Sequence, residues 1–461
     1  MKTKNIITYS LIAFALTVSS CGKKLDIQPV DNIGTDEALE TETDVNNAVV
    51  GAYTIMAGGA LYGTNLVMVP DLYANPGYLQ WTGSFSTFRE ISRQTLLSTN
   101  ADVARTWTQA YRAINAANTV IEALDVVGDE NLKNEIHGKA LFVRGIMYFE
   151  LTRLFGLPYE ANGANSTPAV PIVLKAVKKF PDITTGAKRS TVAEVYTQAE
   201  NDLLKSLELL ENVETNDLYA TMGMLVRLYL QQGKYDKARD YANEIIGSEN
   251  FALASDVEAP FRVKNSSEGV FEIRQNEQSN AGTSNDGLAT FYSSYTNNTG
   301  GYVGRGDINI VDSYYESFDP KDKRKTELIY EGNGVKSSGW FTQKWSGYFD
   351  NIPIVRLSEL ILTRAECNFR LNTAVGATPL DDINAIRKRA GVDVLSTLTL
   401  DLILAERDTE LAFEGYRLHD LKRTKRNVGN LSYNSEKLVY PIPYAERSVN
   451  PLLEQNPGYL Q

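Results

Sequence analysis

The chain has 461 residues, with 46 lysines and arginines against 57 aspartates and glutamates, which gives a net charge of −11. This acidic balance argues against general nucleic-acid binding, because neutralising phosphates requires a surplus of basic side chains. Hydrophobic residues make up 43% of the chain and charged residues 22%, as in ordinary globular proteins. The chain has two histidines, which leave little room for histidine-based metal sites.

The N-terminal segment has the pattern of an export signal. Lys2 and Lys4 precede a mostly apolar run from Ile6 to Val18, which is shorter than the roughly 20 residues that a membrane-spanning helix needs. The pattern predicts a signal peptide over residues 1–20. The segment ends Val18-Ser19-Ser20-Cys21, which resembles a bacterial lipoprotein cleavage box. We expect lipidation of Cys21, and the alternative is an ordinary signal peptide with an incidental cysteine.

The second cysteine, Cys367, has no partner for a disulfide if Cys21 carries lipid. It lies within a run of helical periodicity, and no histidine is near it in the sequence. We therefore expect a small buried hydrophobic side chain and not a nucleophile.

Helical periodicity dominates the first half of the chain. Apolar residues recur at helical spacing over Arg105–Leu124 and over Leu132–Phe155, and Trp107 lies on the apolar stripe of the first helix. After a proline-rich loop, Ser190 is expected to cap a third helix that runs to about Leu210.

The segment from Leu225 to Ala238 resembles a tetratricopeptide repeat. In the pattern Leu225-x3-Tyr229-x3-Gly233-x-Tyr235-x2-Ala238, the glycine makes a turn between two antiparallel helices and the alanine allows their close packing. The period of about 34 residues does not recur cleanly. The sequence therefore predicts degenerate helix–turn–helix repeats.

Residues 251–352 form a loop-rich stretch in which helical periodicity fades. Asn276–Asp307 is rich in Ser, Thr, Asn and Gly, and Val270–Arg274 alternates as a short strand does. Helical periodicity returns in three later segments, Leu357–Leu371, Asp381–Ala390 and Leu400–Arg423.

An ordered set of short motifs follows this stretch and resembles a known family. Motifs of the N-terminal half belong to the same set, namely the cleavage box at Cys21, Gly51-Ala52-Tyr53, and Ala140-Leu141-x2-Arg144-x3-Tyr148-Phe149. The C-terminal motifs are Ile354–Glu359, Arg364-Ala365-Glu366, Ile383–Gly391, Glu406–Arg423, Tyr440-Pro441-Ile442-Pro443 and Asn456-Pro457-Gly458-Tyr459. Over essentially the whole mature chain, this set resembles the SusD/RagB family, the nutrient-binding outer-membrane lipoproteins of Bacteroidetes.

The resemblance implies a mostly α-helical fold in which about four tetratricopeptide-like helix pairs form a scaffold. A single domain over residues 21–461 is expected, with the scaffold mainly in 105–250 and 355–425 and a ligand-binding insertion over about 251–352. The implied protein is not an enzyme and needs no cofactor. It faces the cell exterior and delivers an oligosaccharide to a TonB-dependent SusC-like barrel. Two alternatives are a peptide-binding relative and a tetratricopeptide-type scaffold that binds only protein.

The best catalytic candidates are Glu406, Glu410 and Glu414, at i, i+4 and i+8 of a predicted helix. Glycosidases place two carboxyl groups on either side of the scissile bond, whereas carboxylates on one helix face point the same way. We therefore expect a structural ion-pair network, with Arg407, Arg417 and Arg423 as the partners.

The remaining motifs give no sign of a catalytic or metal site. His419 is assigned a structural or helix-end role, and His137 has no second histidine or cysteine at a ligand spacing. The glycines between Gly300 and Gly306 lack the strand-to-helix context of a nucleotide-binding loop. The chain also has no Asp-x-Asp-x-Asp-Gly calcium loop.

A sugar-binding surface should combine exposed aromatic rings with polar side chains, because sugars present both C–H faces and hydroxyl groups. Two loop-rich stretches have this mixture, residues 73–81 and residues 291–305. The candidate ligand-binding residues are Tyr73, Tyr78, Trp81, Tyr292, Tyr295, Tyr302, Arg305 and Trp340.

Trp81 is the first choice among these rings, because Gly, Pro, Thr and Ser surround it instead of apolar periodicity. The alternative is that these rings are buried between the loops and the scaffold and hold the loops in place, since large aromatic side chains are mostly buried. Trp107, on a helical stripe, is the contrasting residue and is predicted to lie in the core.

Overall fold

The computed structural model describes residues 39–178, 186–213, 215, 217–282, 285–294, 304–333 and 338–459. The elements that follow belong to one unit, Thr41–Gln461. The predicted signal peptide, Cys21, Tyr295 and Tyr302 lie outside the described residues.

Within the described residues, three helices precede the first one expected from the sequence, namely α2 (Glu42–Met56), α3 (Asn65–Tyr73) and α4 (Ser86–Ser92). Thr41 caps α2, because its side chain accepts a hydrogen bond from the backbone of Asp44 while the Asp44 carboxylate accepts one from the backbone of Thr41. One face of α2 is buried and packs against α5 and α6.

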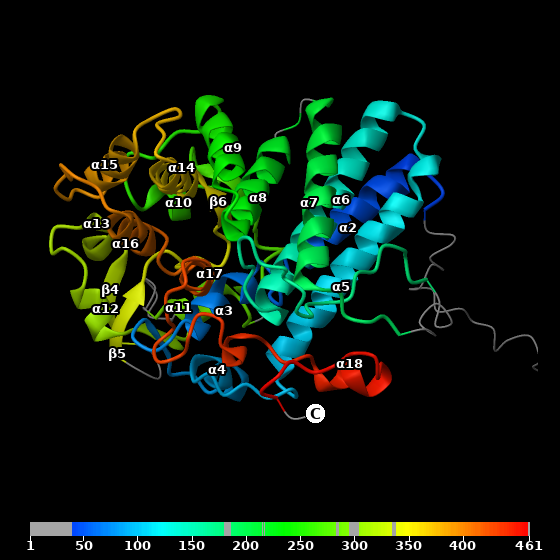
Figure 1. Cartoon of the computed structure of the whole chain (residues 1–461), viewed down its shortest axis with the longest axis horizontal. Coiled ribbons are helices and arrows are strands. Elements are labelled where there is room, and N and C mark those ends of the chain that lie inside the picture. Colours follow the sequence, from blue (N-terminus) through cyan, green and yellow to red (C-terminus); the bar gives the residue numbers. More distant parts are fainter. Residues whose placement is uncertain are drawn as a thin grey trace, which may run out of the picture. The chain divides into compact units, whose positions relative to one another are not determined.

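Five long helices follow, and each packs against the next. In Figure 1 their ribbons run from cyan to green. Trp107 is 3% exposed and packs edge-on against Phe155, which confirms its place in the core. Thr191, and not Ser190, caps the third of these helices, because the Thr191 hydroxyl accepts from the Glu194 backbone in a capping box. The five helices are α5 (Ala101–Glu122), α6 (Glu130–Phe155), α7 (Val192–Glu211), α8 (Asp217–Gln232) and α9 (Tyr235–Gly247).

The tetratricopeptide-like segment forms the helical hairpin α8–α9. Gly233 makes the turn with a φ of +71°, a left-handed conformation that glycine adopts without steric cost. Ala238 is fully buried where the two helices pack, as the pattern predicts.

The C-terminal helices continue this series, since α14 (Leu357–Leu371) packs against α9 and α15 (Pro379–Arg389) packs against α14. The single helix expected over residues 400–423 is wrong, because it is split into α16 (Leu400–Glu410) and α17 (Arg417–Arg423). Phe413 and Gly415 have φ values of +68° and +84° in the break. A Cβ at Gly415 would lie 2.7 Å from the Val67 carbonyl oxygen, so this position requires glycine.

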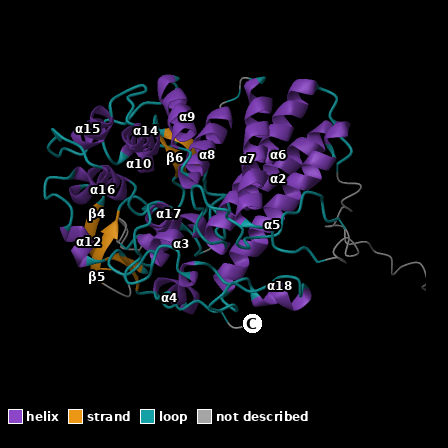
Figure 2. Ribbon diagram, in the orientation of Figure 1, coloured by secondary structure: helices purple, strands orange, loops and turns teal. Residues whose placement is uncertain are grey.

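Short helices and two small antiparallel sheets accompany the long helices (Figure 2). The larger sheet has the strand order β1-β3-β5-β4 and the smaller pairs β2 with β6. No helix among the described residues has the length and hydrophobicity needed to cross a bilayer. The strands are β1 (Leu79–Trp81), β2 (Gly269–Ile273), β3 (Ile308–Ile310), β4 (Ile329–Asn333), β5 (Ser338–Thr342) and β6 (Ile352–Arg356), and the remaining short helices are η1 (Leu124–Val126), α10 (Ala259–Arg262), α11 (Leu288–Tyr292), α12 (Asp312–Glu316), α13 (Lys323–Thr326), η4 (Glu436–Leu438) and α18 (Tyr444–Val449).

Candidate functional site

The larger sheet joins the first stretch selected from the sequence, which contains β1, to the strand β3, which begins just after the second stretch. β1 pairs with β3, so that Trp81 lies opposite Ile308, and the Thr82 backbone N–H donates to the Asp307 carbonyl oxygen at 2.8 Å. β5 pairs with β3 on its other side and places Trp340 opposite Ile310. The sheet therefore brings together three regions of the chain. The region of β1 lies more than 200 residues before the other two in the sequence.

Four of the predicted rings lie in the interior. Their exposed fractions are at most 6%, whereas stacking on a sugar requires an open ring face. Trp81 packs against Phe88 and Phe291 with ring centroids 4.9 and 5.7 Å away. The expectation that Trp81 is an exposed platform is thus corrected, because its polar neighbours in sequence are not its neighbours in space. The four buried rings are Tyr73, Tyr78, Trp81 and Tyr292.

Among the described residues of this region, Phe85 has an exposed ring; it lies in the loop between β1 and α4 and is 37% exposed. The Arg305 guanidinium lies 4.6 Å from its ring centroid, a cation–π distance. Arg305 is held in place by Asp307, whose carboxylate accepts from Nε at 2.7 Å, and by Ser84, whose hydroxyl accepts from Nη2 at 3.2 Å. This arrangement leaves part of an aromatic ring in solvent next to a guanidinium that is held in place.

The buried aromatic rings pack against Phe85. Trp81, Phe88 and Phe291 each lie within 6.5 Å of the Phe85 ring centroid, in tilted or edge-on contacts. The cluster fixes the position of the exposed ring, so little side-chain freedom remains to be lost when a ligand binds.

Phe85 was missed in the sequence, although the signal was present. It lies in Thr82-Gly83-Ser84-Phe85-Ser86-Thr87, where small and polar residues flank a single aromatic side chain. The same argument that selected Trp81 applies to it more strongly.

Trp340 remains a candidate, and it lies on the same sheet. It is half-buried and stacks on Tyr315 with ring centroids 3.6 Å apart and an interplanar angle of 12°. The Lys325 ammonium lies 4.3 Å from the centroid of the Tyr315 ring. This stack adds a second partly exposed aromatic group, together with a cation.

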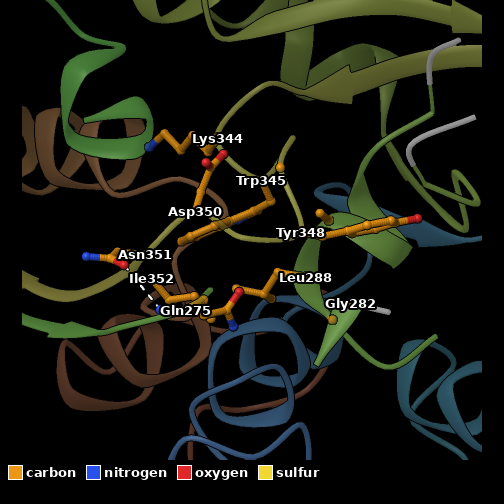
Figure 3. Close-up of a pocket in the computed structure, with 12 residues that line it drawn as sticks. Gln275, Gly282, Leu288, Lys344, Trp345, Tyr348, Asp350, Asn351 and Ile352 are labelled. Atoms are coloured by element: carbon orange, nitrogen blue, oxygen red, sulfur yellow. Dashed lines mark hydrogen bonds between the residues drawn. The ribbon is translucent and has the colours of Figure 1, made fainter. Parts of the chain in front are cut away.

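A pocket under the loop of residues 345–351 does not form a ligand site. Its volume is about 10 Å³, which at most suits a single water molecule. Lys344 and Trp345 line it, as Figure 3 shows, but their polar atoms already bind the Glu414 carboxylate and the Phe413 carbonyl oxygen. The candidate site is therefore the open surface at the edge of the sheet.

The three carboxylates considered for catalysis belong to a buried ion-pair network. Arg356 binds Glu410 at 2.6 Å and Glu414 at 2.7 Å, while Arg324 binds Glu406 at 2.6 Å. Glu414 lies beyond the end of α16, so the three side chains do not share a helix face. The network fits the expected structural role.

The partners expected for this network were wrong. Arg407 and Arg423 both bind Asp420, and Arg417 lies 4.4 Å from the Tyr78 ring centroid. The cations that bind the carboxylates come from distant segments that no sequence spacing could identify, namely Arg324, Lys344, Arg356, Arg387 and Arg389.

Two further reactive side chains, His419 and Cys367, are buried. Burial holds the pKa of His419 well below its usual value, and burial likewise raises the pKa of the Cys367 thiol. A neutral interior imidazole and a protonated interior thiol suit packing more than catalysis. In the part of the chain that the structure describes, no group of His, Cys, Asp or Glu side chains is arranged to hold a metal ion.

Two family models match the chain in succession. Residues 24–230 match a SusD-like model described as starch-binding and associating with the outer membrane, and residues 328–438 match the model of the SusD family. The chain belongs to the SusD family.

Relatives of this SusD-family protein match it over most of its length. SusD-like protein P2 of Formosa agariphila is 25% identical over 98% of this chain and 99% of its own. Starch-binding protein SusD of Bacteroides thetaiotaomicron is 25% identical over 69% of this chain and 72% of its own. A putative sugar-binding protein from Bacteroides vulgatus has a solved structure that is 27% identical, with a TM-score of 0.78, and covers 92% of this chain and all of its own. The mostly helical fold class is confirmed.

Proposed function

We propose that this protein is a non-catalytic binding protein that captures a glycan at the open surface of the four-stranded sheet. The observation that carries the proposal is the exposed Phe85 ring beside the fixed Arg305 guanidinium. A sugar ring can stack its C–H face on the phenyl group while its hydroxyls accept from the guanidinium.

The position of Phe85 favours ligand binding over a purely protein-binding scaffold. A scaffold would keep its aromatic side chains on helix faces, whereas Phe85 is exposed on a loop. The starch-binding and sugar-binding relatives support the same choice.

A neutral glycan fits this surface better than a peptide carboxylate. The charge of Arg305 is already paired with Asp307 at 2.7 Å, which leaves little net attraction for an anion. The network around Glu406, Glu410 and Glu414 pairs these carboxylates with buried cations, which supports a protein without glycosidase activity.

Electrophoresis of the purified protein in native gels that contain starch, laminarin, xylan or a mannan tests this function. We expect slower migration in one of these gels and no release of reducing sugar from the polysaccharide. Unchanged migration across a broad panel would contradict glycan capture, and steady release of product would show an enzyme instead.

The proposed location is the outer membrane, with a lipid on Cys21 as the anchor. Cys21→Ala lacks the sulfur atom to which the acyl chains would be linked. Because stable anchoring needs at least two lipid or electrostatic signals, the variant should not remain attached to the membrane. We expect the variant to appear in the soluble fraction after a salt wash. Recovery of the variant in washed outer membranes, at the wild-type level, would exclude this anchor.

The proposed partner is a TonB-dependent, SusC-like transporter that receives the glycan. A protein that hands a ligand to a barrel should remain bound to it, so gentle detergent extraction and affinity purification should recover both proteins. Repeated recovery of the lipoprotein alone at native expression levels would contradict a stable complex.

A further inference from the structure

A second concave site lies away from the sheet, near the C-terminal end of the chain. Its cavity has a volume of about 230 Å³ and lies between the segment after α4, the helix η4 and the C-terminal segment. None of the candidate residues chosen from the sequence lines it. The lining residues are Gln94, Thr95, Leu96, Glu436, Lys437, Gly458 and Tyr459.

The walls of this cavity are held by hydrogen bonds to the backbone. The Tyr459 hydroxyl donates to the Val439 carbonyl oxygen at 2.6 Å, which fixes the phenol ring against the wall. The Gln94 side-chain amide donates to the Tyr73 carbonyl oxygen at 3.1 Å. Gln94 also has a φ of +56°, a left-handed conformation that costs a non-glycine residue about 1 kcal/mol or more and is often kept at ligand sites.

The size and lining of the cavity select a class of ligand. Its volume is below the roughly 300–1,000 Å³ of pockets for drug-sized molecules, so it suits about one ring. The half-buried Tyr459 ring offers an apolar face, and Thr95 offers a hydroxyl. Both N–H groups of the Gln94 amide donate to the Tyr73 and Asn75 carbonyl oxygens, so Gln94 offers its amide oxygen as an acceptor. The exposed side chains of Glu436 and Lys437 carry opposite charges, so the lining has no net preference for an ion.

We propose that this cavity is a second saccharide-binding site, which takes one neutral sugar ring against Tyr459. The proposal rests on the proposed function for the class of ligand, but not for the site, because neither Phe85 nor Arg305 lines this cavity. A smaller cavity of about 70 Å³ shares Glu436 and is lined by Val439 and Pro457.

Saturation-transfer difference NMR of the full-length protein with glucose, galactose, mannose, xylose and N-acetylglucosamine tests this site. We expect transfer to at least one of these sugars, and an affinity at least about fivefold weaker in Tyr459→Ala, in line with the loss of a stacked ring. Tyr459→Phe keeps the ring and should keep the binding. Thr95→Trp fills the cavity from its exposed rim without removing a core contact, and should abolish the transfer.

Two control variants separate this site from the sheet. Phe85→Ala should weaken polysaccharide binding but retain the monosaccharide transfer that arises from the cavity, and Tyr444→Ala removes an exposed tyrosine that does not line the cavity. The second site is refuted if no sugar shows transfer, if Thr95→Trp and Tyr459→Ala bind as the wild type does, or if Phe85→Ala removes all transfer. If a polysaccharide still retards Thr95→Trp in native gels, the proposed function remains supported in each of these cases.

Discussion

Glu410→Ala should lower the free energy of unfolding by about 3–5 kcal/mol, the range observed when one partner of a buried ion pair is removed. Glu410 is 3% exposed and binds Arg356 at 2.6 Å, Arg324 at 3.2 Å and Arg389. The substitution leaves these three guanidinium groups buried with less compensating charge. The shift in melting temperature is the change in free energy divided by the entropy of unfolding. For a unit of roughly 420 residues, about 1 kcal/mol corresponds to about 1 °C, so the melting temperature should fall by about 3–6 °C.

The pH dependence of this effect follows from the pKa of Glu410. Burial alone would raise that pKa, but Arg389, Arg356, Arg324 and Lys344 together hold it well below its usual value. A depressed folded-state pKa stabilises the fold above the unfolded-state value of about 4.3, and this stabilisation is lost as the pH falls through the folded-state pKa. The difference between the wild type and Glu410→Ala should therefore be full at pH 7 and shrink below about pH 4.

Glu208→Ala is the matched control, because Glu208 also lies on a helix and pairs with Lys205 at 2.6 Å, but its side chain is 63% exposed. Exposed pairs of this kind contribute at most about 1 kcal/mol. Thermal unfolding followed by circular dichroism at pH 7 compares the two variants. Equal melting temperatures for Glu410→Ala and Glu208→Ala would show that the buried network does not stabilise the fold.

Phe85→Ala should weaken glycan binding by roughly threefold to tenfold, since a stacked ring contributes about 0.5–1.5 kcal/mol beyond buried area in aromatic pairs. Folding should change little, because more than a third of the side chain is in solvent and Trp81, Phe88 and Phe291 retain their mutual contacts. Calorimetric titration with the glycan that retards the protein in gels measures the change.

Three variants serve as controls for Phe85→Ala. Phe85→Tyr keeps the ring and should bind as the wild type does, while Tyr444→Ala removes an exposed ring elsewhere and should have no effect. Trp81→Ala should lower the melting temperature, because truncating a buried tryptophan costs about 3–5 kcal/mol. Normal binding by Phe85→Ala would remove this residue from the site.

The series of long helices from α5 to α9 can be predicted from the sequence because its signals are local. Apolar spacing defines the stripe that contains Trp107, and a single glycine marks the turn at Gly233. The break between α16 and α17 cannot be predicted in this way, since it depends on the close approach of Gly415 to the carbonyl oxygen of Val67, far away in the chain.

The candidate site can be predicted as a region but not ring by ring. The residues around Trp81 and Arg305 were selected by composition, and the pairing of β1 with β3 brings them together. Which ring faces solvent depends on the aromatic cluster that forms when α4 and α11 pack beside this sheet, so Trp81 is buried and Phe85 is exposed. Sequence neighbours cannot reveal that difference.

The crystal structure of the protein with a bound oligosaccharide from the polysaccharide that retards it tests the account most directly. The account predicts a sugar ring stacked on Phe85, with a hydroxyl oxygen within hydrogen-bond distance of the Arg305 guanidinium. An oligosaccharide bound at full occupancy elsewhere, with Phe85 and Arg305 facing solvent as they do in the free protein, would contradict it.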